Sequence, residues 1–119
     1  MQRFEVIADL FCQNGVETCF ALLGDANMHW AGAMHERGVE FIYTRHEHAA
    51  VAAAAAYTRS SGKMGCASVT CGPGLTQIMT ILPIAVRANI PIVIFAGEAP
   101  IGKPWYNQMI DQAPFVQAC

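Results

Sequence analysis

Predicted helices and apolar strands alternate along most of the chain, and this alternation limits the fold more than any other feature. The apolar segments are continuous runs such as TCFALL and PIVIFA, without the alternating polar positions of a half-exposed strand. Continuous apolar strands that alternate with helices are typical of a parallel sheet with helices on both faces. The sequence therefore predicts one α/β domain over residues 1–119.

Glycine, asparagine and proline residues mark where most of these segments end. Asn27 is expected to cap a helix with its side chain. The stretch after Gly97 has loop composition. Any ligand is expected at the carboxyl ends of the strands. The predicted helices cover 3–14, 28–37, 46–60 and 75–89, and the predicted strands cover 18–23, 39–44, 65–70 and 91–96.

The composition indicates a domain that is covered by other protein surface. Hydrophobic residues make up 54% of the chain and charged residues 13%, against about 25% charged residues in an ordinary soluble domain. This shortage of charge suggests that more chain or a partner subunit covers part of the surface. The net charge is −2 and there is no run of Lys or Arg, which argues against nucleic acid or an anionic membrane as a partner.

Membrane insertion and metal binding by cysteine are also disfavoured. The longest apolar run, residues 49–57, is too short to span a bilayer. The five cysteines show neither a C-x-x-C motif nor a zinc-binding spacing. An odd number of cysteines without a secretory signal indicates reduced thiols and a cytoplasmic location. No metal ligand set is predicted within this chain.

The stretch TRHEHAA places four polar residues before an alanine-rich helix. Glu47 near a helix start is stabilised by the helix dipole, by about 0.3–1 kcal/mol, so helix capping accounts for an acidic residue there. His46 and His48 lie two positions apart and do not share a helix face, which argues against a paired ligand set. Glu47 therefore either stabilises the helix or takes part in chemistry.

The stretch VTCGPGLT joins a strand to a helix through glycines. Gly72 and Gly74 lack Cβ atoms, so a ligand can approach the backbone, and the helix start would offer free N–H donors. A tight connection between strand and helix accounts for the same residues equally well. The dinucleotide fingerprint is absent, because Gln77 stands where the third glycine belongs.

Two alternative functions follow from the residues alone. Cys71, on a turn from strand to helix, could be the nucleophile of a cysteine hydrolase of flavodoxin-like fold. His46 or His48 would be its base if the second and third strands were neighbours. The G-x-C-x-G form of a nucleophile turn is absent, however. The other alternative is a truncated interaction domain without catalysis.

Three segments together carry a specific resemblance to a known family. GVETCFALLGDANM, YTRHEHAAVAAAAAYTRSSGKMGCASVTCGPGLTQ and ANIPIVIFAGEAP resemble the N-terminal, pyrimidine-binding domain of the thiamine diphosphate-dependent enzymes. This superfamily includes acetolactate synthase and the 2-keto acid decarboxylases. The match runs from Phe4 to at least Gly97 in order and spacing. It implies the flavodoxin-like fold that binds thiamine diphosphate in that family.

The resemblance assigns a role to Glu47. In the family, the glutamate of R-H-E hydrogen-bonds N1′ of the aminopyrimidine ring and so activates the cofactor, which then attacks a 2-keto acid. His48 and Gln112 are expected to contact the substrate. The other positions implied to bind the cofactor are Gly24, Asp25, Asn27, Thr70, Cys71, Gly72, Pro73, Gly74 and Gln77.

Departures from the family pattern leave the reaction open. Leu23 replaces a common proline, Cys71 a common serine and Gln77 a common asparagine. Carboligation of the acetolactate synthase type is the first expectation, followed by decarboxylation and acyl transfer. Binding of FAD is left open, because no residue of the chain indicates it.

The resemblance also implies partners outside this sequence. The family binds the cofactor diphosphate through Mg²⁺ in a C-terminal domain with a G-D-G motif and a pair of asparagines, and neither occurs here. The chain is therefore expected to be a C-terminally incomplete pyrimidine-binding domain, without the central and diphosphate domains. By itself it is expected to be inactive. In the family the active site lies between subunits, which implies a homodimer or homotetramer.

Overall fold

The computed structural model describes residues 1–103 and 105–119. Its strands are β1 (Thr18–Ala21), β2 (Glu40–Tyr43), β3 (Gly65–Val69) and β4 (Ile92–Ala96). Its helices are α1 (Arg3–Gln13), α2 (Met28–Glu36), α3 (Glu47–Ser61), α4 (Pro73–Thr76), α5 (Leu82–Arg87) and α6 (Ala113–Gln117).

The strands form one sheet in the order β2-β1-β3-β4, and every neighbouring pair is parallel. Ala21 near the carboxyl end of β1 pairs with Tyr43 of β2 and with Ser68 of β3. The carboxyl ends of these strands therefore lie along one edge of the sheet. The predicted parallel α/β fold is confirmed.

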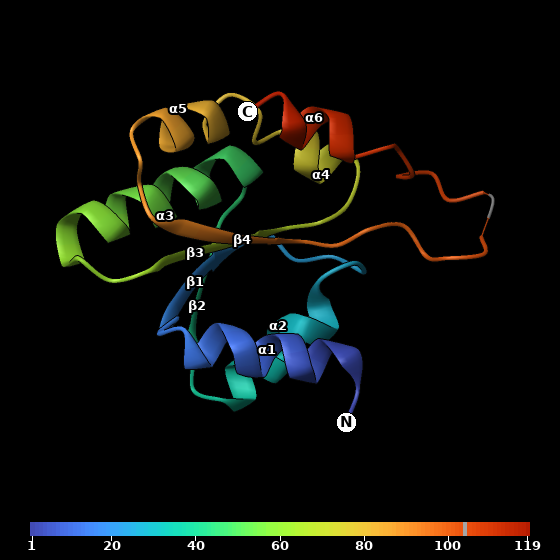
Figure 1. Ribbon diagram of the computed structural model, residues 1–119. Coiled ribbons are helices and arrows are strands. Elements are labelled where there is room, and N and C mark those ends of the chain that lie inside the picture. Colours follow the sequence, from blue (N-terminus) through green and yellow to red (C-terminus); the bar gives the residue numbers. More distant parts are fainter. Residues whose placement is uncertain (104) are drawn as a thin grey trace.

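Helices cover both faces of the sheet, as predicted (Figure 1). α1 and α2 lie on one face, and α3, α4, α5 and α6 lie on the other. The core under α1 and α2 is built around Trp30 and Met34, which are almost completely buried. The core under α3 contains Ala50, Val51 and Ala54, none of which is exposed to solvent.

α3 is the longest helix and carries the polar stretch at its start. Its alanines are strong helix formers, and His46 caps it by accepting a hydrogen bond from the backbone N–H of His48, at 3.1 Å. The helix ends at Gly62, whose φ of 73° lies in the left-handed region that favours glycine. These caps place Glu47 in the first turn of α3, at the carboxyl edge of the sheet.

The prediction of a single helix over residues 75–89 is wrong. The structure contains the short helix α4, then turns, then α5 from Leu82 to Arg87. Pro83 explains the second start, because proline lacks a backbone N–H and is favoured in the first turn of a helix but not in its interior.

The composition had suggested that the whole chain after Gly97 is a loop, and this prediction is wrong in part. Residues 113–117 form α6, with Pro114 in its first turn. No helix in the described part of the chain is both long and apolar enough to cross a membrane.

Candidate functional site at the carboxyl edge of the sheet

The loops after β1 and β3 meet closely at the carboxyl edge. A Cβ atom placed on Gly24 would lie 2.6 Å from Cγ2 of Thr70, so only glycine allows this approach. Thr70 is buried. The structure thus brings together two of the predicted cofactor-binding positions, Gly24 after β1 and Thr70 after β3.

Glu47 lies over the glycine loop after β3. A Cβ atom on Gly74 would lie 3.5 Å from Oε1 of Glu47 and 2.6 Å from Oγ1 of Thr70. Glu47 is half-buried, and no hydrogen bond from the residues that the structure describes engages its carboxylate. A half-buried carboxylate without a partner, beside a loop that lacks side chains, can accept or hold a proton for a bound ligand.

Asn27 does not cap α2 with its side chain, which corrects the sequence prediction. Its Oδ1 accepts from the N–H of Gly24 at 2.8 Å, and its Nδ2 donates to the carbonyl of Leu22 at 3.1 Å and to Oγ of Ser68 at 2.9 Å. Ser68 in turn donates to the carbonyl of Phe95 at 2.9 Å. This buried network fixes the loop after β1 to the adjacent strands.

The backbone of the glycine loop offers fewer donors than the sequence had suggested. α4 has four residues and begins at Pro73, which has no N–H. The N–H of Gly72 donates to Oε1 of Gln112 at 2.8 Å, and Nε2 of Gln112 donates to the carbonyl of Gly97 at 3.0 Å. A ligand would therefore meet a loop whose N–H group at Gly72 is already hydrogen-bonded, and not a row of free N–H groups.

Cys71 lies in a setting that disfavours a nucleophile. It is buried, and burial raises the pKa of its thiol, with smaller contributions in the same direction from the charges of Asp25 and Glu98. β1 lies between β2 and β3, so the condition for His46 or His48 as its base is not met. The sulfur instead contacts Oε1 of Gln108 at 3.7 Å.

Three other predicted residues are exposed or half-buried. Asp25 and Gln77 are exposed and make no side-chain hydrogen bond within the described part of the chain, and His48 is half-buried in the first turn of α3. The ring of His48 lies 6.5 Å from that of His46. No group of three His, Cys, Asp or Glu side chains in residues 1–103 and 105–119 is arranged to hold a metal ion.

Two residues at this edge were missed by the sequence analysis. Ser68 is fully buried and links Asn27 to β4; its signal was a hydroxyl group inside an otherwise apolar strand. Gln108 accepts from the hydroxyl of Tyr106 at 3.3 Å. The contact of Gln108 with Cys71 could not be predicted, because the two residues lie 37 positions apart.

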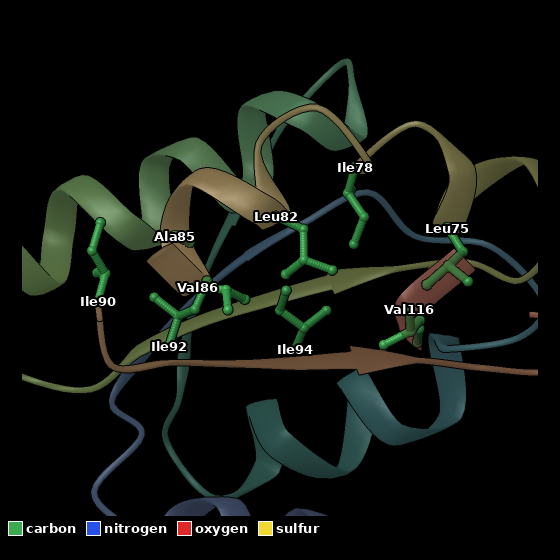
Figure 2. Close-up of a pocket in the computed structure, with 10 residues that line it drawn as sticks. Leu75, Ile78, Leu82, Ala85, Val86, Ile90, Ile92, Ile94 and Val116 are labelled. Carbon is green, nitrogen blue, oxygen red and sulfur yellow. The ribbon is translucent and has the colours of Figure 1, made fainter. Parts of the chain in front are cut away.

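A separate apolar groove of about 300 Å³ runs between α5 and β4. In Figure 2, Leu82, Val86, Ile92 and Ile94 extend into this groove from α5 and β4. Within the described part of the chain, only apolar side chains line it. A charged cofactor therefore fits the carboxyl edge of the sheet better than this groove.

A parallel α/β domain with a carboxylate over a glycine loop belongs to the class that binds small ligands at the carboxyl edge of the sheet. Comparison with known protein families is more specific. Residues 1–115 match the family model of the thiamine pyrophosphate enzymes, N-terminal TPP binding domain. The chain belongs to this family, and thiamine pyrophosphate is the same compound as thiamine diphosphate.

Individual relatives share between about a third and two fifths of the aligned residues. The acetolactate synthase large subunit of Haemophilus influenzae is 40% identical over 79% of this chain and 17% of its own length. The 2-hydroxyacyl-CoA lyase 2 of Danio rerio is 38% identical over 80% of this chain and 15% of its own length. The acetolactate synthase large subunit IlvG of Mycobacterium tuberculosis is 32% identical over 98% of this chain and 22% of its own length.

Proposed function

We propose that this chain is the pyrimidine-binding part of a thiamine diphosphate-dependent enzyme that acts on a 2-keto acid by carboligation of the acetolactate synthase type. The chain spans only 15% to 22% of the length of these three relatives, so the activity belongs to a larger assembly. The observation that carries the proposal is the position of Glu47, whose carboxylate lies over Gly74 without a partner in the described residues.

The residues at this edge suit an aminopyrimidine ring. Gly74 has no side chain between its backbone and Oε1 of Glu47, so a flat ring could approach both. The Glu47 carboxylate would hold a proton at a ring nitrogen, and a charge-assisted hydrogen bond of this kind contributes about 1.5–3 kcal/mol. When bound, the cofactor supplies the carbon nucleophile and the electron sink that 2-keto acid chemistry requires.

The surrounding side chains would orient the ring and exclude water from it. Asn27 and Ser68 fix the loop that carries Gly24, and Thr70 separates Gly24 from Gly74. Cys71, in the loop after β3, is buried, which suits a packing role. His48, on the half-exposed side of α3, remains the proposed substrate contact.

The proposal includes Mg²⁺, a second subunit and a cytoplasmic location. Mg²⁺ would hold the cofactor diphosphate through parts of the protein outside residues 1–119, as the family resemblance implies. A dimer or tetramer would cover apolar side chains at the β2 edge, where Ile42 is 42% and Tyr43 66% exposed. All five cysteines are free thiols, which suits a reducing compartment.

The first experiment replaces Glu47 by glutamine in the complete natural protein. Glu47→Gln keeps size and polarity but cannot share a proton with a ring nitrogen in the same way. We expect exchange of the cofactor C2 proton for deuterium, followed by NMR, to slow by about 10²–10⁴-fold, the usual contribution of a positioned proton-transfer group. Cofactor binding, measured by titration calorimetry, should fall much less.

A matched control is Glu36→Gln, which makes the same change at an exposed position on α2. This variant should exchange the C2 proton at the wild-type rate. Unchanged exchange in Glu47→Gln would remove the proposed role of Glu47. If the wild-type protein neither bound the cofactor nor promoted exchange, the alternative of a non-catalytic interaction domain would be favoured.

A further inference from the structure

The side chain of Gln112 joins three segments that are distant in sequence. It lies at the start of α6, is only 8% exposed, and bonds the N–H of Gly72 through Oε1 and the carbonyl of Gly97 through Nε2. One amide thus links the loop after β3 to the end of β4. Both of its polar atoms are used within the protein, which leaves little capacity for the substrate contact that the sequence had suggested.

The loop that Gln112 holds has an unusual backbone conformation. Gly72 has φ of 62° and ψ of −114°, a combination that side-chain-bearing residues rarely adopt. The carbonyl of Gln108 packs directly against Gly72, where a Cβ atom would overlap it. The segment from Gln108 to Gln112 therefore determines the path of the glycine loop from two sides.

The path of this loop sets the surroundings of Glu47. Gly74, two residues after Gly72, is the point that approaches both Oε1 of Glu47 and Oγ1 of Thr70. A shift of the backbone at Gly72 would move Gly74 relative to the carboxylate. Displacements of this size matter, because a 1 Å error in a binding geometry can cost about a hundredfold in rate.

We propose that Gln112 is a positioning residue, which holds the glycine loop in the conformation that receives the pyrimidine ring opposite Glu47. This inference rests on the proposed function. Gln112 acts through Gly72 and Gly97 and touches neither Glu47 nor the reacting atoms. Its role requires one acceptor and one donor on the same planar group, which among uncharged side chains of this length only an amide supplies.

The first test measures the hydrogen bond itself and needs no cofactor. In the complete natural protein, Gln112→Ala should speed hydrogen–deuterium exchange of the Gly72 amide by about tenfold, because a buried N–H loses its acceptor. Peptides from β1 and β3 should keep their protection, which distinguishes a local change from unfolding. The control is Gln117→Ala, an exposed glutamine on the same helix, which should leave exchange at Gly72 unchanged.

The second test uses thiamine diphosphate with Mg²⁺ as the probe. Gln112→Ala should raise the dissociation constant by about tenfold to a hundredfold, the range expected when buried partners are left unsatisfied. Gln117→Ala should bind as the wild type does. Titration calorimetry on the complete protein gives both values directly.

A third variant separates hydrogen bonding from space filling. Gln112→Glu has nearly the same shape, but an ionised carboxylate can only accept hydrogen bonds. It would keep the hydrogen bond from the N–H of Gly72 and would repel the carbonyl oxygen of Gly97. A protonated carboxyl group donates once and restores both bonds. The ratio of the dissociation constant of Gln112→Glu to that of the wild type should therefore fall by about fivefold or more when the pH is lowered from about 8 to about 5.5. Burial raises the pKa of a carboxyl group, so the group becomes protonated in this range.

The outcomes separate this inference from the proposed function. Unchanged exchange at Gly72 in Gln112→Ala, or a Gln112→Glu binding ratio that does not vary with pH, would overturn the positioning role even if the wild type binds the cofactor. A wild type that fails to bind thiamine diphosphate would overturn the proposed function, and with it the link from Gln112 to the cofactor. Faster exchange at Gly72 with weaker, pH-rescued binding supports both.

Discussion

The face of the sheet under α1 and α2 is filled by aromatic rings, whereas the face under α3 is filled largely by alanine side chains. On the first face, Trp30 stacks on Phe95 with ring centres 4.3 Å apart, and the edges of Phe11 and Phe41 approach it at 5.2 and 6.2 Å. Large rings bury much apolar area and hold α1 and α2 at a distance from the sheet.

On the other face, small residues let the backbone of α3 approach the sheet directly. Ala50 and Ala54 are fully buried, and a Cβ atom on Gly65 would overlap the backbone oxygen of Ala54. Thr58 adds a hydrogen bond from its hydroxyl to the carbonyl of Pro91, at 3.1 Å. Contacts through backbone atoms leave α3 little freedom to move.

This difference suggests that the two faces serve different purposes. The aromatic face carries none of the predicted site side chains beyond Asn27, and its main contribution is the burial of apolar surface. The alanine face carries Glu47 at the start of α3, and the distance of that helix from the sheet sets the height of the carboxylate above Gly74. The first face should therefore respond mainly in stability, and the second in both stability and cofactor binding.

The largest expected effect is the loss of the central ring on the aromatic face. Trp30→Ala should lower the free energy of unfolding by about 3–5 kcal/mol, because it leaves a large cavity among Phe11, Phe41 and Phe95. Trp30→Phe should cost clearly less, since it keeps a ring and removes Nε1, which is buried without a partner among the described residues. Urea denaturation measures both, and equal losses would contradict this account of the face.

The next effect tests the close approach on the alanine face. Gly65→Ala should lower the free energy of unfolding by about 1–3 kcal/mol through overpacking against Ala54, and should weaken cofactor binding by displacing α3. Trp30→Phe should leave binding nearly unchanged. Denaturation and titration calorimetry on the same variants would show whether binding follows the alanine face specifically.

Gly32→Ala is the matched control for this substitution. Gly32 lies inside α2, and a Cβ atom there would meet no atom of the described residues within 4 Å. The same change should therefore raise the free energy of unfolding by about 0.5–1 kcal/mol, because alanine is a better helix former than glycine. A loss of stability in Gly32→Ala would show that glycine replacement is harmful for reasons other than crowding.

The sequence predicted the order and type of most elements because their signals are local. Continuous apolar runs indicated buried parallel strands, and glycine after each long helix indicated its end, as at Gly62. Local signals failed at two prolines that lie in the first turn of a helix. Pro83 started a second helix, and Pro114 started α6 in a segment of loop composition.

The site was predictable only as a set of strand ends. Parallel topology places the ends of β1 and β3 together, so the proximity of Gly24 to Thr70 follows from the sheet. The hydrogen bonds from Asn27 to Ser68 and from the N–H of Gly72 to Gln112 did not follow, because these pairs lie 41 and 40 positions apart. No periodicity in a sequence reports which loop folds over which.

The smallest expected effects come from two exposed ion pairs. Asp9 on α1 pairs with Arg37 after α2, and the hydrogen bond from Arg37 lowers the pKa of the Asp9 carboxyl group. A carboxyl group with a lowered pKa stabilises the folded state at pH values above its ordinary pKa. This contribution is therefore lost as pH falls below about 4. In Asp9→Asn, the free energy of unfolding should depend less steeply on pH in that acid range.

Lys63 and Glu17 lie at the amino edge of the sheet and give the opposite sign. The hydrogen bond to Glu17 raises the pKa of the Lys63 ammonium group. The contribution of Lys63 to stability is present at pH values below the ordinary pKa of lysine and is lost as pH rises above about 10. Lys63→Met should therefore alter the alkaline limb of the curve of stability against pH. Because both pairs are exposed and screened by salt, urea titrations at low ionic strength are the suitable measurement. An unchanged alkaline limb in Lys63→Met would contradict the assignment.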